Sequence, residues 1–301
     1  MIHEPVLLNE VIEKLDLKQG QVVVDGTFGG GGHAQALLEK IQPDGVLLGI
    51  DLDGELLEQA REKYKSSSFS GSLILANGNY ADIVNIATEN GIHEADAVLL
   101  DLGMSSWHLD ESQRGFSFTR DEPLDMRYQR MNIVGESKTA AAIVNRYPEN
   151  KLADIIYEYG EERLSRKIAR AIVQAREKKR IETTGELIEI IGSAVPGWYK
   201  HGKIHFATRT FQALRIEVNG ELDNLKHGLP AAFNILKRGG MLAVISFHSL
   251  EDRIVKLFGR EQIKNETGEF INKKPIIAGA GENESNPRAR SAKLRIIKKM
   301  I

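Results

Sequence analysis

A short apolar strand that runs into a glycine-rich turn constrains the fold of this chain more than any other feature. Residues 22–25 read Val-Val-Val-Asp, and five of the next seven residues are glycine. Residues 34–41 then repeat apolar side chains at helical spacing. Glycine lets the backbone adopt positive φ angles and lets a ligand approach without a Cβ in the way. A strand, a glycine turn and a helix in this order predict a site for a nucleotide-like ligand.

The first hundred residues alternate between strand and helix patterns. Strands are expected over 22–25, 45–51, 73–76 and 97–101. Helices are expected between them, over 32–41, 54–65 and 81–90. Continuous apolar runs between helical segments are typical of a parallel sheet covered on both faces. The fold class is therefore predicted to be α/β.

This alternation stops after residue 103. The stretch 103–131 has no clear period, and 152–191 has a helical period only, with Thr183 and Glu186 spaced as a capping box. No strand is expected again before 241–246. A helical domain inserted into the sheet domain explains this order.

The sequence thus predicts three segments: 1–104 and 209–301 form the sheet domain, and 105–208 form the insert. Two details of the last segment follow from its periods. A helix over 212–236 is expected to lead into the strand at 241–246. The alternating run 291–298 is expected to be an edge strand, paired in a hairpin with 275–278.

Composition excludes several function classes. The 301 residues contain no cysteine, so disulfides, thiol catalysis and cysteine-ligated zinc are excluded. No apolar run approaches membrane-spanning length and the N-terminus lacks a signal-peptide layout, so a cytoplasmic protein is expected. The net charge of −2 does not indicate a nucleic-acid binder, but residues 163–180 carry eight basic side chains against one acid. Residues 285–301 carry six and no acid. Such local patches bind phosphate or are simply solvated faces.

Acidic residues at the strand ends indicate which ligand the glycine turn holds. Asp51 ends the second strand, where an acid accepts hydrogen bonds from both ribose hydroxyls, or caps the following helix. Both NAD and S-adenosylmethionine fit this arrangement. Asp25 distinguishes them, because a carboxylate beside the turn repels a pyrophosphate but suits the ammonium and sulfonium groups of S-adenosylmethionine. The sequence therefore favours S-adenosylmethionine.

Other side chains are placed around the same ligand. His33 begins the first helix, where its N–H and the helix N-terminus are suited to hold a carboxylate, unless it is an ordinary half-buried histidine. Tyr80 follows the third strand and either packs on an adenine face or belongs to the core. Asp101 ends the fourth strand, where it contacts the reacting groups or caps a turn.

The stretch after Asp101 is rich in aromatic and basic residues. Trp107, Phe116 and Phe118 alternate with arginines, a mixture that suits stacking on bases and contact with phosphates. The alternative is that these rings dock the insert on the sheet. A metal site at His248, Glu251 and Asp252 is a further alternative, although this segment reads equally well as a strand end and a helix cap.

Several long motifs, in order along the chain, carry a resemblance to a known family. They are HEPVLLNE at 3–10, DGTFGGGGH at 25–33, DLGMSS at 101–106, RGFSF at 114–118, PLDMR at 123–127, ATRTFQALR at 207–215, SFHSLEDR at 246–253 and NPRARSAKLR at 286–295. The chain resembles the RsmH (MraW) family of bacterial 16S rRNA cytosine-N4 methyltransferases over its whole length.

The resemblance implies a class I, Rossmann-like methyltransferase sheet with a helical insert that recognises RNA, and S-adenosylmethionine as the methyl donor. It implies a cytidine of 16S rRNA, cytidine 1402, in the small ribosomal subunit near the P site as the acceptor, and it points to a homodimer. The cofactor-binding positions that carry over are Gly31, Gly32, His33, Asp51, Tyr80, Asp101 and His108. The family usually has Arg at Gly30, Pro-Gln at Trp107 and His108, and Phe at Tyr80.

The amine of cytosine is a poor nucleophile because its lone pair is delocalised into the ring. Acceptors aimed at its N–H groups favour a tetrahedral nitrogen, and we expect Asp101 and Ser105 or Ser106 to supply them. Two other functions remain open from the sequence. One is an NAD-dependent oxidoreductase, and the other is a non-catalytic ribosome-binding factor with the same fold.

Overall fold

The computed structural model describes residues 5–65, 67, 69, 72–129 and 138–301. His3 and residues 130–131, which belong to stretches analysed above, lie outside this part. The chain divides into two compact units. The first, here called the sheet unit, comprises 1–103 and 222–301, and the second, the helical unit, comprises 104–221.

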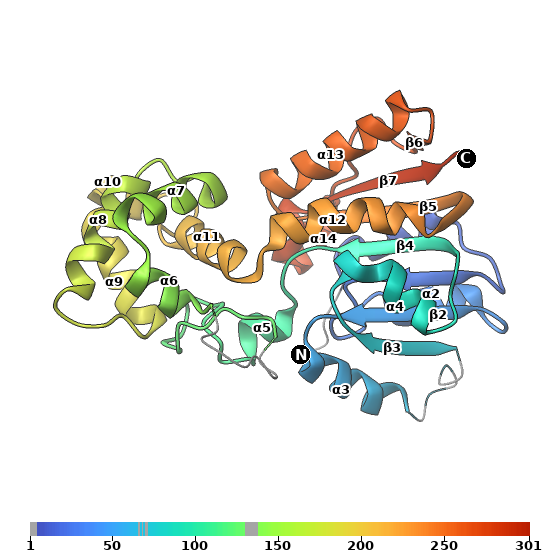
Figure 1. Ribbon diagram of the computed structural model, residues 1–301, viewed down its shortest axis with the longest axis horizontal. Helices are drawn as coiled ribbons and strands as arrows, with labels where there is room; N and C mark the ends of the chain where they lie inside the picture. Colours follow the sequence, from blue (N-terminus) through green and yellow to red (C-terminus); the bar gives the residue numbers. More distant parts are fainter. Residues whose placement is uncertain (1–4, 66, 68, 70–71, 130–137) are drawn as a thin grey trace. The chain divides into compact units, whose positions relative to one another are not determined.

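The sheet unit contains a seven-stranded sheet in the order β3-β2-β1-β4-β5-β7-β6 (Figure 1). Its strands are β1 (Val22–Asp25), β2 (Val46–Asp51), β3 (Leu73–Asn77), β4 (Ala95–Asp101), β5 (Leu236–Ser246), β6 (Gly268–Phe270) and β7 (Lys293–Lys299). Strands β1 to β5 run parallel, and β7 pairs antiparallel with both β5 and β6. The strand order reverses between β1 and β4, the point at which α/β sheets bind ligands. The predicted parallel sheet is confirmed.

Helices cover both faces of this sheet. They are α1 (Leu8–Leu15), α2 (Ala34–Ile41), α3 (Gly54–Tyr64), α4 (Ile83–Glu89), α12 (Glu221–Asn234), α13 (Ser249–Lys264) and α14 (Ala280–Ser285), with short helices η1 (Tyr80–Asp82) and η2 (Pro287–Ser291). Successive strand residues point to opposite faces. Accordingly Val23 packs in one apolar cluster with α1 and α2, and Val24 packs in another with α4 and α12. The continuous apolar strands therefore reflect burial on both faces.

The helical unit has a core of its own. Its helices are α5 (Ser106–Asp110), α6 (Ala140–Arg146), α7 (Glu149–Gly160), α8 (Ser165–Arg176), α9 (Thr184–Ala194), α10 (Gly197–Lys200) and α11 (Thr208–Asn219). The capping box of Thr183 and Glu186 opens α9 as predicted. The unit continues to Glu221, beyond the expected end of the insert at 208, because α11 carries Phe211 and Leu214 into the same apolar cluster as α7.

Three local expectations were wrong. The helix over 212–236 is two helices, because Gly220 between α11 and α12 has a φ of 62° that ends the first. Strand β7 is not at the edge, since β6 pairs beside it, although Ile276 does form an antiparallel bridge to Leu294. Strand β5 begins at Leu236, and its register with β4 shifts before Met241.

Within the described ranges, no helix combines the length and the apolar composition needed to cross a bilayer.

Candidate cofactor and active site

The glycine turn is fixed between two neighbouring strands. The backbone N–H of Gly26 donates to the carbonyl of Leu99 in β4 over 2.9 Å, and that of Phe28 donates to Ile50 in β2 over 2.9 Å. The Phe28 ring is buried against Gly49, where a Cβ would lie 2.2 Å from it. The Phe28 ring therefore packs the turn against β2, and this packing requires glycine at position 49.

The glycines of the turn differ in what they require. Gly31 has a φ of 73°, and a Cβ there would lie 3.1 Å from the Phe28 ring and 3.2 Å from the Tyr64 ring. Gly30 faces open space, and a Cβ at this position would meet nothing within 4 Å. Position 30 therefore has room for a longer side chain. Gly32 is partly exposed and directly precedes His33, the residue before α2.

Three carboxylates end the neighbouring strands β2, β1 and β4. Asp51 accepts hydrogen bonds from the backbone N–H of Gly29 over 2.7 Å and of Asp53 over 2.8 Å. It therefore holds the glycine turn in place. Asp53, not Asp51, is the N-cap of α3, because its carboxylate accepts from the N–H of Glu55. The alternative role of Asp51 as a helix cap is excluded.

The other two acids are poorly compensated. Burial raises the pKa of Asp25 to about 7, the charge of Asp51 adds to the effect, and a hydrogen bond from the Thr27 backbone N–H opposes it. Burial also raises the pKa of Asp101 well above its usual range, as do the charges of Asp25 and Glu251. Both carboxyls are thus raised in pKa by burial and by repulsion from neighbouring acids, so a positive charge placed beside them would favour their ionised forms.

His33 and Asp101 face each other at the same edge. The Nε2 atom of His33 lies 3.1 Å from the carbonyl oxygen of Val6, and its Nδ1 lies 3.8 Å from Asp101 Oδ2. The carbonyl requires a proton on Nε2, so a neutral His33 presents Nδ1 as an acceptor towards Asp101. The histidine is only 4% exposed. It is a positioned buried side chain rather than an ordinary half-buried one.

Thr27 fixes the backbone of Asp101. The backbone N–H of Asp101 donates to Thr27 Oγ1 over 2.6 Å. The Oδ1 atom of Asp101 is buried and has no hydrogen-bond partner within the described residues. A buried acceptor without a donor is costly, so this oxygen marks a place where a ligand donor belongs. Sequence analysis missed Thr27, and its only signal was a hydroxyl two residues after Asp25.

Tyr80 begins η1 and is half-buried. A Cβ on Gly228 of α12 would lie 2.5 Å from the Tyr80 ring, so the ring packs closely on that helix. It also packs against the apolar cluster of α4 and α12. Tyr80 thus packs against the core. Part of its ring stays exposed, and a contact between this part and an adenine stays a prediction.

The remaining predicted site residues belong to the helical unit. Ser105 is the N-cap of α5, accepting from the His108 N–H, while the Ser105 N–H donates to His108 Nδ1 over 3.2 Å. Ser106 is the first residue of that helix. The His108 ring is buried beside Phe116 and Tyr128, with ring centroids 5.2 and 5.0 Å apart. Ser105 and His108 thus stabilise α5, and their roles in catalysis and cofactor binding stay predictions.

The aromatic and basic stretch is mostly internal to the helical unit. Phe116 is 4% exposed and stacks on Tyr128 at 5.3 Å. Arg114 is fully buried, lies over the Trp107 ring at 4.9 Å and donates to the carbonyl of Tyr128. These residues build the core of the helical unit, in place of the exposed stacking surface that their composition suggested.

The segment proposed for a metal has structural roles. His248 caps α13 and Glu251 completes the capping box, so the interpretation of this segment as a helix cap is confirmed. Asp252 accepts from Arg295 Nε over 2.7 Å, which holds its pKa below the usual range for aspartate although burial opposes this. Helix α13 is thereby attached to β7.

Comparison with known proteins identifies the family. The description "MraW methylase family" fits residues 1–300. "Ribosomal RNA small subunit methyltransferase H" of Persephonella marina is 48% identical over 99% of both chains. The protein of that name from Deinococcus deserti is 50% identical over 100% of this chain and 94% of its own. A solved rRNA methylase from Streptococcus thermophilus has a TM-score of 0.47 at 10% identity, covering 100% of this chain and 99% of its own.

These relatives confirm the prediction of a methyltransferase with a Rossmann-like α/β sheet, and with it S-adenosylmethionine as the cofactor. They contradict the alternative function of an NAD-dependent oxidoreductase. Because the match spans nearly the whole sequence and full-length relatives are about half identical, the chain belongs to the MraW methylase family.

Proposed function

We propose that this protein transfers a methyl group from S-adenosylmethionine to N4 of one cytidine of 16S rRNA, cytidine 1402 near the P site of the small ribosomal subunit. The names of its relatives support the small-subunit rRNA substrate. The family resemblance of the motifs supports the cytidine and its N4 atom. The observation that carries the proposal is the group of acids around the glycine turn, at one edge of the sheet.

The residues at this edge fit the cofactor. When bound, S-adenosylmethionine supplies an electrophilic methyl group on a sulfonium cation. Asp25 and Asp101 have raised pKa values because they are buried close to other acids, and Asp101 Oδ1 has no donor within the described residues. Positive charge and N–H donors at this place relieve both costs. A pyrophosphate would increase the repulsion.

Each cofactor residue then has a distinct task. Asp51, which already orients the turn at the end of β2, is proposed to accept hydrogen bonds from the ribose hydroxyls. Gly31 and Gly32 leave the backbone accessible, and the backbone N–H of His33 together with the start of α2 provides donors for a carboxylate. Tyr80 presents its exposed part to the adenine, and His108 is proposed as a further contact.

The acceptor amine requires help from hydrogen-bond acceptors. Asp101 accepts an N–H of the cytosine amine, which favours a tetrahedral nitrogen, and also orients the cofactor. Ser105 and Ser106 are proposed as further acceptors. Reaching such a site requires the cytidine to be unstacked, since its amine is inaccessible inside a helix.

The segment 105–208 is proposed to recognise the RNA. In the helical unit, α8 exposes Arg166, Lys167 and Arg170 along one side, and such a row suits contacts to phosphates. We further propose that the protein works in the cytoplasm as a homodimer.

Mass spectrometry of 16S rRNA tests this function. Cells that lack the protein are expected to lose one methyl group from N4 of cytidine 1402, and the wild-type gene is expected to restore it. An unchanged cytidine in the deletion strain would contradict the proposal. Restoration by a variant that cannot bind S-adenosylmethionine would indicate a non-catalytic ribosome-binding factor instead.

A further inference from the structure

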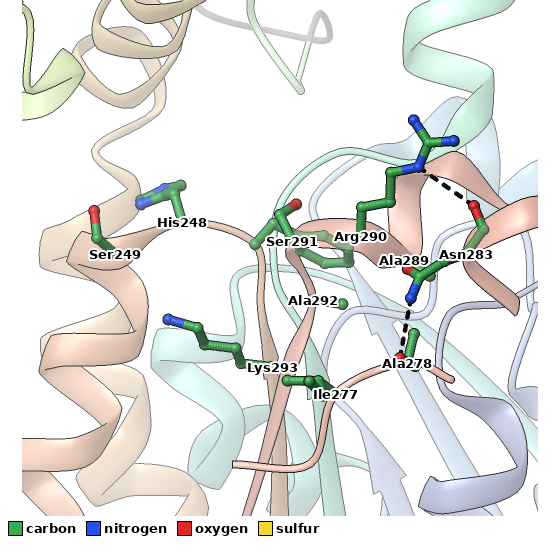
Figure 2. Close-up of a pocket in the computed structure, with 11 residues that line it drawn as sticks. His248, Ser249, Ile277, Ala278, Asn283, Ala289, Arg290, Ser291, Ala292 and Lys293 are labelled. Atoms are coloured by element: carbon green, nitrogen blue, oxygen red, sulfur yellow. Dashed lines mark hydrogen bonds between the residues drawn. The ribbon is translucent and has the colours of Figure 1, made fainter. Parts of the chain in front are cut away.

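The sheet unit contains a hollow of about 310 Å³. None of the residues that line it belongs to the glycine turn. Three segments contribute to the lining of the hollow: residues 247–249 at the junction of β5 and α13, residues 277–278, and the C-terminal part of the chain around η2, namely Asn283 and residues 289–293. Figure 2 shows these segments facing one space. The volume is at the lower end of the range of small-ligand sites, roughly 300–1,000 Å³.

Small side chains leave this space open. Ala278, Ala289 and Ala292 are 7%, 1% and 1% exposed and form an apolar floor. Ser249 and Ser291 add short hydroxyl side chains. Larger residues at these positions would fill the hollow, so the sequence maintains a cavity with an apolar base and polar walls.

The residues that line the hollow carry positive charge and no carboxylate. Arg290 donates from Nε to the carbonyl of Asn283 over 3.3 Å, and Figure 2 shows its two terminal nitrogens turned away from that carbonyl. Lys293 Nζ lies 3.3 Å from Asp252 Oδ2, but Arg295 occupies the other oxygen of the same carboxylate at 2.7 Å. One carboxylate thus compensates two cations, and a surplus positive charge remains at the wall.

His248 does not add to this surplus. Its Nε2 lies 3.2 Å from Glu251 Oε1, and its Nδ1 accepts from the Glu251 backbone N–H over 3.4 Å. Helix α13 also begins at this wall, but Glu251 and Asp252 in its first turn already compensate the partial positive charge of its N-terminus. Arg290 and the surplus charge beside Lys293 are therefore the groups that suit a negatively charged ligand in the hollow.

We propose that this hollow binds one nucleotide of the substrate RNA through its phosphate group. Arg290 and Lys293 supply charge-assisted hydrogen bonds to the phosphate, and the alanine floor carries the apolar face of the sugar or base. The inference rests on the proposed function, because it takes the polyanion to be 16S rRNA. It adds a substrate site on the sheet unit to the RNA contacts proposed for the helical unit.

A charge placed in the hollow tests this inference against the same charge placed outside it. Ser291→Glu introduces a carboxylate at the exposed rim, and Ser285→Glu introduces one at an exposed position that does not line the hollow. We expect Ser291→Glu and Arg290→Gln each to weaken binding of a 16S rRNA fragment about tenfold at low salt, as the loss of one charged hydrogen bond does. Arg290→Gln is expected to lower the salt slope by about 0.7. Ser285→Glu is expected to bind as the wild type does.

Fluorescence anisotropy over a salt series measures these affinities, with the melting temperature as a check of folding and calorimetry as a check of S-adenosylmethionine binding. Wild-type affinity in both Ser291→Glu and Arg290→Gln would overturn the inference while leaving the methylation of 16S rRNA intact. A wild-type protein that binds the fragment but leaves N4 of the cytidine unmethylated would overturn the proposed function alone. Equal weakening by Ser285→Glu would also overturn the inference, because it would show a general charge effect.

Discussion

At the scale of single residues, the buried carboxyl of Asp25 makes the stability of the fold depend on pH. Burial raises the pKa of Asp25 to about 7, whereas the unfolded chain releases this proton near 3.8. Between these values the folded protein binds more protons than the unfolded one, so its stability falls as the pH rises through this window. Above about pH 7 the loss is complete.

Asp25→Asn removes this loss and keeps an acceptor for the Thr27 N–H. We expect the variant to gain stability over the wild type as the pH rises from 4 to 7, by up to about 4 kcal/mol, and to gain no more above that. Chemical denaturation of the ligand-free protein at several pH values measures this difference. The exposed Asp44→Asn is the control, and a difference independent of pH would contradict the assignment.

A different prediction applies to Asp101, because we propose that it accepts a hydrogen bond from the cytosine amine during methyl transfer. Asp101→Asn keeps the shape of the side chain but offers a weaker acceptor to the cytosine amine. We expect single-turnover methyl transfer to slow by about a hundredfold, a loss typical of one preorganised polar group, with RNA affinity unchanged. Rapid-quench assays at saturating S-adenosylmethionine and rRNA measure the rate. A wild-type rate would remove Asp101 from the mechanism.

Sequence patterns located the residues of the sheet edge better than their partners. Asp25, Asp51 and Asp101 end apolar strands, and parallel strands bring such ends together, so their proximity was predictable. The hydroxyl of Thr27 and the pairing of Ser105 with His108 were not. Such contacts depend on how a turn closes and on which residue caps a helix, and neither follows from periodicity.

At the scale of elements, helix α12 positions Tyr80. A Cβ on Gly228 would lie 2.5 Å from the ring, closer than real Cβ contacts allow. We therefore expect Gly228→Ala to displace Tyr80, to lower stability by about 1–3 kcal/mol and to weaken S-adenosylmethionine binding measured by calorimetry. Gly281→Ala in α14, where a Cβ meets nothing within 4 Å, is the matched control. If the two variants bind S-adenosylmethionine with equal affinity, Tyr80 does not contribute to the cofactor site.

Helices and strands with a strong hydrophobic periodicity had bounds that were predictable to within one or two residues, as β1 and α3 show. The errors lie where one residue changes the chain direction or where pairing is long-range. Gly220 divides a continuous helical pattern because its backbone is left-handed. Strand β7 alternates like an edge strand, but β6 covers it, and the pairing of two distant segments leaves no local signal.

At the scale of the whole molecule, the net charge of −2 conceals separate basic regions. Long-range attraction between a nearly neutral protein and RNA is weak, so binding must depend on local contacts that release counterions. The slope of log affinity against log salt then measures the number of phosphate contacts. The contribution of each basic region can be tested by replacing its charged side chains with neutral ones.

Helix α8 gives the sharpest test of this kind. Arg166 and Lys167 are exposed on it. We expect the double variant Arg166→Gln/Lys167→Gln to lower the slope of log affinity against log salt for 16S rRNA by about 1.4, the value for two phosphate contacts on a single strand. The matched control neutralises Arg260 and Lys264, exposed cations near the far end of α13. If both double variants change the slope equally, the attraction is nonspecific, and the helical unit has no special part in holding the RNA.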